Sequence, residues 1–266
     1  MSKALTYASY LRLDELLNMQ TPRSAGPHGH GAEHDELLFI VVHQVYELWF
    51  KQILHEIDHL QGLLRATEPA RAAHTTRRIL AILKTVVAQL DVMETMTPLE
   101  FNAFRGYLES SSGFQSAQFR EIEFACGYKR DKVLEFYPEG SSERDRLAAR
   151  YARPTLWGAF LRYLHLNGYA VPPDALDHDV TAPVEPSPGV QDLLIEVYRG
   201  DVGARNVCEG LVDIDEGFQE WRYRHVKMVE RTIGAKTGSG GSAGATYLAS
   251  TVKPFFPDLW AIRSRL

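Results

Sequence analysis

The chain of 266 residues is 45% hydrophobic and 24% charged, and its formal net charge is −5. This composition is typical of a globular protein that can bury a sizeable core. Acidic and basic residues are intermixed, so there is no basic stripe to bind a nucleic-acid backbone, and we expect no nucleic-acid partner.

The sequence also predicts neither a membrane span nor a secretion signal. The longest uninterrupted apolar run, Leu37 to Val42, is far shorter than the roughly 20 residues of a membrane helix. The first residues lead into no signal-peptide core. Cys126 and Cys208 form no disulfide framework and belong to no CxxC pair. We therefore expect a cytoplasmic protein with no membrane partner and with two buried thiols.

Apolar residues recur every three or four positions along most of the chain, which predicts helices. The expected helices cover residues 9–19, 35–64, 69–95, a segment that begins at 98, 114–125, 142–151, 155–166, 190–198 and 204–233. Thr97, Pro98 and Glu100 have the pattern of a capped helix start, and the tail to Leu266 is expected to be mostly short helix.

Three segments interrupt the helical pattern. Residues 20–31 are rich in Pro, Gly and His, residues 171–189 hold five prolines, and residues 234–244 hold five glycines. We interpret 171–189 as a long surface loop within one domain, because neither flank alone carries a complete set of apolar faces. No alternating strand pattern or internal repeat is evident. The prediction is an all-α fold with one domain, residues 1–266.

The helix over residues 35–64 organises this prediction. On a helical wheel its apolar arc contains Phe39, Val42, Val45, Tyr46, Trp49, Phe50, Ile53, Ile57 and Leu60. The opposite, hydrated arc contains Gln44, Lys51, Gln52, Glu56 and Asp58. His43 lies at the edge of the apolar arc, so its imidazole faces an aromatic interior where a flat apolar ligand could lie. The alternative is a core histidine with a purely structural role.

A second histidine has a similar setting near the other end of the chain. His225 lies in the apolar line of the helix over 204–233, together with Phe218, Trp221 and Met228. Two histidines on interior helix faces suggest a haem site, because a neutral imidazole is a common axial ligand of iron and a second one can hold O2 or steer a substrate proton. A helical bundle can also contain two core histidines without any cofactor.

A zinc motif competes with this hypothesis. Residues 55–59, HEIDH, match the HExxH pattern of zinc proteases, but Arg65 stands where the longer pattern has its third histidine. The wheel places His55 and His59 on the hydrated arc, whereas a catalytic zinc needs three protein ligands in a cleft. We interpret the match as a coincidence.

Six motifs along nearly the whole chain carry a family resemblance. They are YLRLD at 10–14, FIVVHQ at 39–44 followed by ELW at 47–49, FNAFR at 101–105, SGFQS at 112–116, WRYRH at 221–225 and GSGGS at 238–242. Together these motifs resemble the tryptophan 2,3-dioxygenase family. The resemblance implies a helical bundle around a buried b-type haem, one per subunit and ferrous in the active state, in a homotetramer. It implies cleavage of the indole C2–C3 bond of L-tryptophan by O2 to give N-formyl-L-kynurenine, in tryptophan catabolism through the kynurenine pathway.

The resemblance also implies roles for individual residues on the haem side. His225 is expected to be the proximal iron ligand, with Trp221 and Ser112 beside the haem. His43 is expected to be the distal, catalytic histidine near the indole N–H.

On the substrate side, the resemblance implies that Arg105 holds the amino-acid carboxylate. An arginine suits this role because its planar guanidinium can bind a carboxylate through two parallel hydrogen bonds. The other expected substrate contacts are Phe39, Phe101, Ile40, Val41, Val42 and Ser239. Tyr7, Tyr10 and Leu11, in an N-terminal arm over residues 1–20, are expected to complete the pocket of a neighbouring subunit.

Ser239 is a departure from the family pattern, which usually has threonine at this place in the glycine loop. The hydroxyl is kept and a methyl group is lost. This leaves open a related haem oxygenase that acts on a substituted tryptophan or mono-oxygenates the indole to an oxindole. A non-catalytic haem sensor or carrier is the alternative from another class.

Overall fold

The computed structural model describes residues 4–25, 31–234, 236 and 245–266. Within these ranges every regular element is a helix and none is a strand, which confirms the all-α prediction. The α-helices are α1 (Tyr7–Leu11), α2 (Leu13–Leu16), α3 (His34–Arg65), α4 (Pro69–Met93), α5 (Pro98–Arg105), α6 (Ala117–Cys126), α7 (Ser142–Tyr151), α8 (Leu156–Leu166), α9 (Pro173–Leu176), α10 (Pro188–Gly200), α11 (Val202–Ile233), α12 (Ala245–Ser250) and α13 (Pro257–Ala261). Short 3-10 helices are η2 (Gly106–Leu108), η3 (Gly113–Gln115), η4 (Asp131–Phe136) and η5 (Ile262–Arg265).

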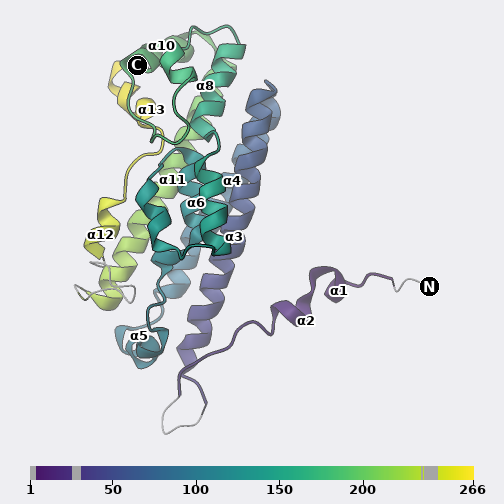
Figure 1. Cartoon of the computed structure of the whole chain (residues 1–266), viewed down its shortest axis with the longest axis vertical. Coiled ribbons are helices and arrows are strands. Elements are labelled where there is room, and N and C mark those ends of the chain that lie inside the picture. The colour runs from purple at the N-terminus through teal and green to yellow at the C-terminus, as the bar shows by residue number, and fades with distance from the viewer. Residues whose placement is uncertain (1–3, 26–30, 235, 237–244) are drawn as a thin grey trace.

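The long helices α3, α4 and α11 run side by side through the body (Figure 1), with α6 and α8 packed on α3. Their inward faces carry fully buried side chains such as Ile57, Ile79 and Ile214. Each such side chain stabilises the fold by about 1.5–3 kcal/mol relative to exposure. Gly210 and Gly217 allow α11 to lie close to α4, because a Cβ on either glycine would be 3.0 Å from a side-chain carbon of α4.

Helix boundaries follow local capping chemistry. Thr97 and Glu100 form the predicted capping box at the start of α5. The helix predicted from residue 114 begins at Ala117 instead, because Ser116 caps it and residues 113–115 form the separate turn η3. Gly127 ends α6 as predicted, with φ of 110°, a conformation that favours glycine.

Three local predictions are wrong. The helix expected over 9–19 is two short helices separated at Arg12, and they lie in an arm that extends away from the body (Figure 1). The segment 171–189 is not only a surface loop, because it contains α9 and its Val171 is buried. Glu56, placed on the hydrated arc of α3, is buried and paired with Arg78 of α4.

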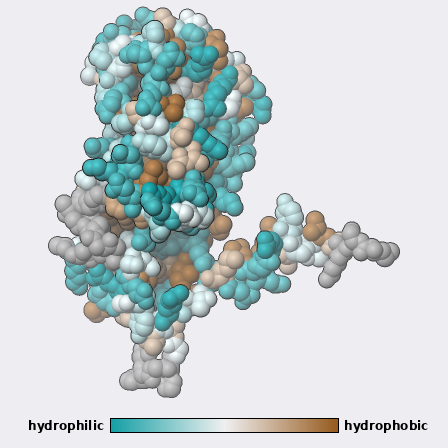
Figure 2. Space-filling model, in the orientation of Figure 1, coloured by the Kyte–Doolittle hydropathy of each residue, from teal (hydrophilic) through white to brown (hydrophobic). Residues whose placement is uncertain are grey.

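The surface view of the body is mostly hydrophilic, with scattered apolar side chains there and on the N-terminal arm (Figure 2). Helix α3 is long and apolar enough, by length and composition, to span a membrane. A core helix of a soluble protein has the same length and composition.

Cys126 and Cys208 are both buried and free, as predicted.

Candidate functional site

A cavity lies between α3 and α11, and residues of α4, α5, α6, η3 and α12 also line it. It has two lobes. The first, of about 90 Å³, is lined by Trp221 and Arg120, and the second, of about 140 Å³, by Phe101 and Arg105. His43 and His225 line both lobes. The lobes also share Met93, Gly113, Phe114, Met228 and Leu248. The two histidines singled out in the sequence therefore face one space, although they lie near opposite ends of the chain.

His43 is held in a defined orientation on α3. Its Nδ1 donates a hydrogen bond of 2.7 Å to the carbonyl of Phe39, one turn earlier. The centroids of the His43 and Phe39 rings are 4.1 Å apart. Burial lowers the pKa of His43, although the bond to Phe39 and the charge of Glu47 act in the opposite direction. The imidazole is therefore neutral at neutral pH, and its Nε2 remains as the hydrogen-bond acceptor.

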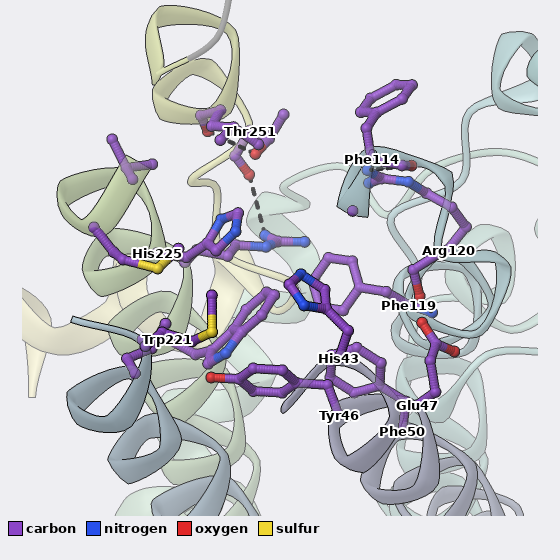
Figure 3. Close-up of a pocket in the computed structure, with 18 residues that line it drawn as sticks. His43, Tyr46, Glu47, Phe50, Phe114, Phe119, Arg120, Trp221, His225 and Thr251 are labelled. Carbon is purple, nitrogen blue, oxygen red and sulfur yellow. Dashed lines mark hydrogen bonds between the residues drawn. The ribbon is translucent and has the colours of Figure 1, made fainter. Parts of the chain in front are cut away.

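His225 reaches the same space from α11. Its ring stacks on that of Trp221, one turn earlier, with 5.3 Å between centroids and 11° between planes (Figure 3). Burial lowers the pKa of His225 to about 4, with smaller contributions from His43 and Arg120. A neutral imidazole is the form that binds a metal ion. Trp221 also contacts the rings of Tyr46, Phe50 and Phe119, so the lobe of about 90 Å³ that these residues line has aromatic walls.

Positive charge is concentrated at the edge of this first lobe. The fully buried carboxylate of Glu123 accepts hydrogen bonds from Arg120 at 2.7 Å, Arg222 at 2.8 Å and Arg130 at 2.5 Å. Three guanidinium groups around one carboxylate leave an excess of positive charge; Arg120 and Arg222 line this lobe, and Glu47 is the acidic residue in its lining. Such a wall favours an anionic group in the cavity.

The second lobe combines aromatic walls with one further guanidinium. Phe39 of α3 and Phe101 of α5 lie 5.9 Å apart between ring centroids, and both line this lobe. Arg105, in the last turn of α5, and Ser112, the N-cap of η3, line it as well. A flat apolar body that carries a carboxylate would fit these surroundings.

Other expected site residues lie elsewhere. Ile40, Val41 and Val42 are not among the lining residues: Val42 packs in the core, and Val41 is 39% exposed. One face of a helix can line the cavity, and on α3 this face carries Phe39 and His43, so the residues between them turn away.

The remaining expectations concern segments outside the body of the site. Tyr7, Tyr10 and Leu11 lie on the exposed N-terminal arm and not at this chain's own cavity. Ser239 lies outside the described residues. His55 and His59 are exposed on α3, and no cluster of three metal-binding side chains occurs in the described part of the chain.

Several lining residues were not predicted, notably Arg120, Arg222, Phe114 and Thr251. Arg222 precedes His225 by three positions on one helix, so helical spacing could have placed it on the same face. Arg120 and Thr251 reach the cavity only through the packing of α6 and of the segment after α12, which no local pattern encodes.

Comparison with known proteins gives a consistent result. The family model described as tryptophan 2,3-dioxygenase matches residues 1–148 and 189–266. A relative from Herpetosiphon aurantiacus is 66% identical over the whole of both chains. One from an Anaeromyxobacter species is 57% identical over 100% of this chain and 97% of its own, and one from a Nocardioides species is 44% identical over 98% and 95%. All three relatives are named tryptophan 2,3-dioxygenase.

Proposed function

This chain belongs to the tryptophan 2,3-dioxygenase family, and from this premise we propose that it is an enzyme that oxygenates L-tryptophan with O2 to N-formyl-L-kynurenine. The observation that carries the proposal is the single cavity that combines two neutral histidines, a cationic wall and an aromatic lobe with Arg105. We place the reaction in tryptophan catabolism through the kynurenine pathway.

The residues of the first lobe fit a haem. His225 would hold the iron, since its imidazole is neutral and enclosed by aromatic rings. Arg120 and Arg222 would pair with the anionic propionates. We propose a non-covalent haem b, one per subunit, because Cys126 and Cys208 are buried outside the cavity lining and belong to no CxxCH motif. When bound in the ferrous state, haem supplies the O2 chemistry.

The chain's own residues then have to hold and orient the amino acid. Arg105 would bind the carboxylate, and Phe39 and Phe101 would enclose the indole. Because Nδ1 of His43 already donates to the Phe39 carbonyl, Nε2 is the nitrogen that can accept a hydrogen bond from the indole N–H. His43 would thus fix which edge of the indole faces the reacting O2, and the apolar lining would exclude water.

The N-terminal arm has its own place in the proposal. Tyr7 and Tyr10 are 77% and 73% exposed, and Leu11 is also exposed. Large apolar side chains on an arm are suited to docking on another molecule. We propose that residues 1–20 dock on a neighbouring subunit of a homotetramer and complete its pocket.

Ser239 bears on the choice of substrate. The relatives named above favour tryptophan dioxygenation over a substituted tryptophan, over mono-oxygenation to an oxindole and over a sensor without turnover. Ser239→Thr adds one methyl group to the glycine loop. If the serine made room for a ring methyl group, this variant would shift kcat/KM in favour of plain tryptophan; we expect little change.

The decisive experiment is an anaerobic absorption spectrum of the reduced full-length protein, followed by addition of O2 and L-tryptophan. We expect a Soret band, tryptophan-dependent O2 uptake, and a product that contains both atoms of isotopically labelled O2. A Soret band without turnover would favour the sensor, one labelled atom would favour the oxindole, and stoichiometric zinc without haem would contradict the proposal.

A further inference from the structure

The methionines of this chain are unevenly distributed. The sequence has five, of which Met1 lies outside the described residues and Met19 is 64% exposed on the N-terminal arm. The other three, Met93, Met96 and Met228, all line the cavity between α3 and α11. The body of the protein therefore has its methionines in one place, around the candidate active site.

These three side chains come from separate elements and face the same space. Met93 is the last residue of α4, Met96 lies in the connection to α5, and Met228 follows His225 by three positions on α11. Met93 and Met228 line both lobes, and Met96 lines the second. Methionine sulfur lies among the side chains around His225 and Trp221 (Figure 3). A small molecule in either lobe would therefore meet thioether groups.

The size of the cavity and the burial of these residues restrict what can react with them. Met93 is 7% and Met96 is 5% exposed, and Met228 is half-buried. The lobes of about 90 and 140 Å³ each exceed the roughly 30 Å³ that one water molecule occupies, so an oxidant as small as hydrogen peroxide fits. Cys126 and Cys208 do not line the cavity, and methionine is thus the oxidisable sulfur in its lining.

We propose that Met93, Met96 and Met228 form an oxidative modification site, at which hydrogen peroxide converts the thioethers to sulfoxides. The sulfur donates an electron pair to one peroxide oxygen, an S–O bond forms, the O–O bond breaks, and the other oxygen leaves as water with both protons. The sulfur loses two electrons and the peroxide gains them, so the step needs no further reactant. Its product is a polar group in place of a flexible apolar one.

Sulfoxide formation changes what the cavity binds. A thioether packs favourably beside aromatic rings, whereas a sulfoxide adds a polar oxygen to a lobe that is enclosed by Phe39 and Phe101. The added oxygen disfavours a flat apolar ligand, because it takes up space and loses hydration when that ligand covers it. This consequence rests on the proposed function, in which the ligand is L-tryptophan. Oxidation should weaken tryptophan binding by at least about tenfold.

The modification itself is tested by peptide mass spectrometry of the haem-loaded full-length protein after timed exposure to hydrogen peroxide. The control is Leu211→Met, which adds a thioether to α11 at a 2% exposed core position outside the cavity lining, with little change in volume. We expect Met93, Met96 and Met228 to gain one oxygen atom each, at least about tenfold faster than the introduced thioether. Exposed Met19 reports the peroxide dose.

Two results would overturn the assignment of the site. One is oxidation of the cavity methionines no faster than that of the thioether introduced by Leu211→Met. The other, which needs no variant, is that Met93, Met96 and Met228 stay unmodified in wild type at a dose that fully oxidises Met19.

The consequence for binding is tested with Met93→Leu/Met96→Leu/Met228→Leu, a triple variant that nearly keeps the side-chain volumes and removes the sulfur. The affinity for L-tryptophan is measured anaerobically before and after peroxide treatment. Wild type should lose at least about tenfold in affinity, and the triple variant should keep the affinity of its own untreated form. An equal loss in both would show that the damage lies elsewhere and would overturn the proposed effect.

Protection by substrate separates this inference from the proposed function. Saturating L-tryptophan should slow oxidation of Met93, Met96 and Met228 and leave that of Met19 unchanged. Fast oxidation of the three methionines that tryptophan does not slow would still support the modification site, and would contradict L-tryptophan as the ligand of this cavity.

Discussion

Glu123 should be among the charged residues whose loss most destabilises this protein. Its carboxylate is 0% exposed and accepts from three arginines, of which Arg120 and Arg222 are themselves buried. Glu123→Gln keeps the shape of the side chain, so the change removes charge and creates no cavity. Breaking a buried ion pair by removing one partner typically costs about 3–5 kcal/mol. For a chain of this size that corresponds to a fall in Tm of about 6–20 °C.

The pH dependence of this effect has a definite sign. Burial alone would raise the pKa of Glu123, but the charges of Arg120, Arg222 and Arg130 outweigh it and lower the pKa. A carboxyl group whose pKa is lowered in the folded state stabilises the fold above its unfolded pKa, and this contribution is lost as the pH falls through the folded pKa. The difference in Tm between wild type and Glu123→Gln should therefore be full at neutral pH and should shrink below the ordinary glutamate range.

Thermal unfolding followed by circular dichroism measures this effect, with Glu209→Gln as the matched control. Glu209 pairs with Arg263, but the side chain of Glu209 is 44% exposed and that of Arg263 is 34% exposed. Loss of this ion pair should therefore cost about 1 kcal/mol or less. Equal shifts in Tm for the two variants, or a difference that grows on acidification, would refute the reasoning about the buried cluster.

The remaining predictions concern the cavity between α3 and α11. His225→Ala should abolish histidine ligation of haem iron while leaving helix content near wild type, and a normal five-coordinate ferrous spectrum in this variant would contradict the assignment. His43→Ala should lower kcat yet retain haem, because one lost positioning hydrogen bond typically costs at most about 3 kcal/mol; loss of haem would mean that the two histidines have the opposite roles. Arg105→Ala should raise KM for L-tryptophan much more than Ser239→Ala does, since an unpaired buried carboxylate is costlier than an unpaired hydroxyl. Equal kcat/KM of wild type for tryptophan and tryptamine would rule out the carboxylate contact.

The long helices were predictable because their signals are local. The bounds of α3, α4 and α11 lie within about two residues of those expected from apolar periodicity and caps. Periodicity also placed His43 and His225 on interior faces. It could not show that both line one cavity, because that depends on how α3 and α11 sit against each other.

Glu56 shows what a helical wheel cannot predict. The wheel correctly places this residue outside the apolar arc of α3, but it cannot show whether a neighbouring helix covers the opposite side of α3. Helix α4 does so and supplies Arg78, whose Nη1 lies 3.2 Å from Oε1 of Glu56. A polar residue outside the apolar arc of a helix can therefore still be buried where a second helix covers it and supplies a partner.

The buried ion cluster joins the cavity wall to the C-terminal segment. Arg222 lines the cavity and binds Glu123, and it also donates hydrogen bonds of 3.1 and 3.2 Å to the carbonyls of Thr251 and Lys253. Thr251 itself lines the cavity. One guanidinium thus fixes two walls that are remote in sequence, because it holds residues 251–253, the segment after the glycine loop, against Glu123 of α6.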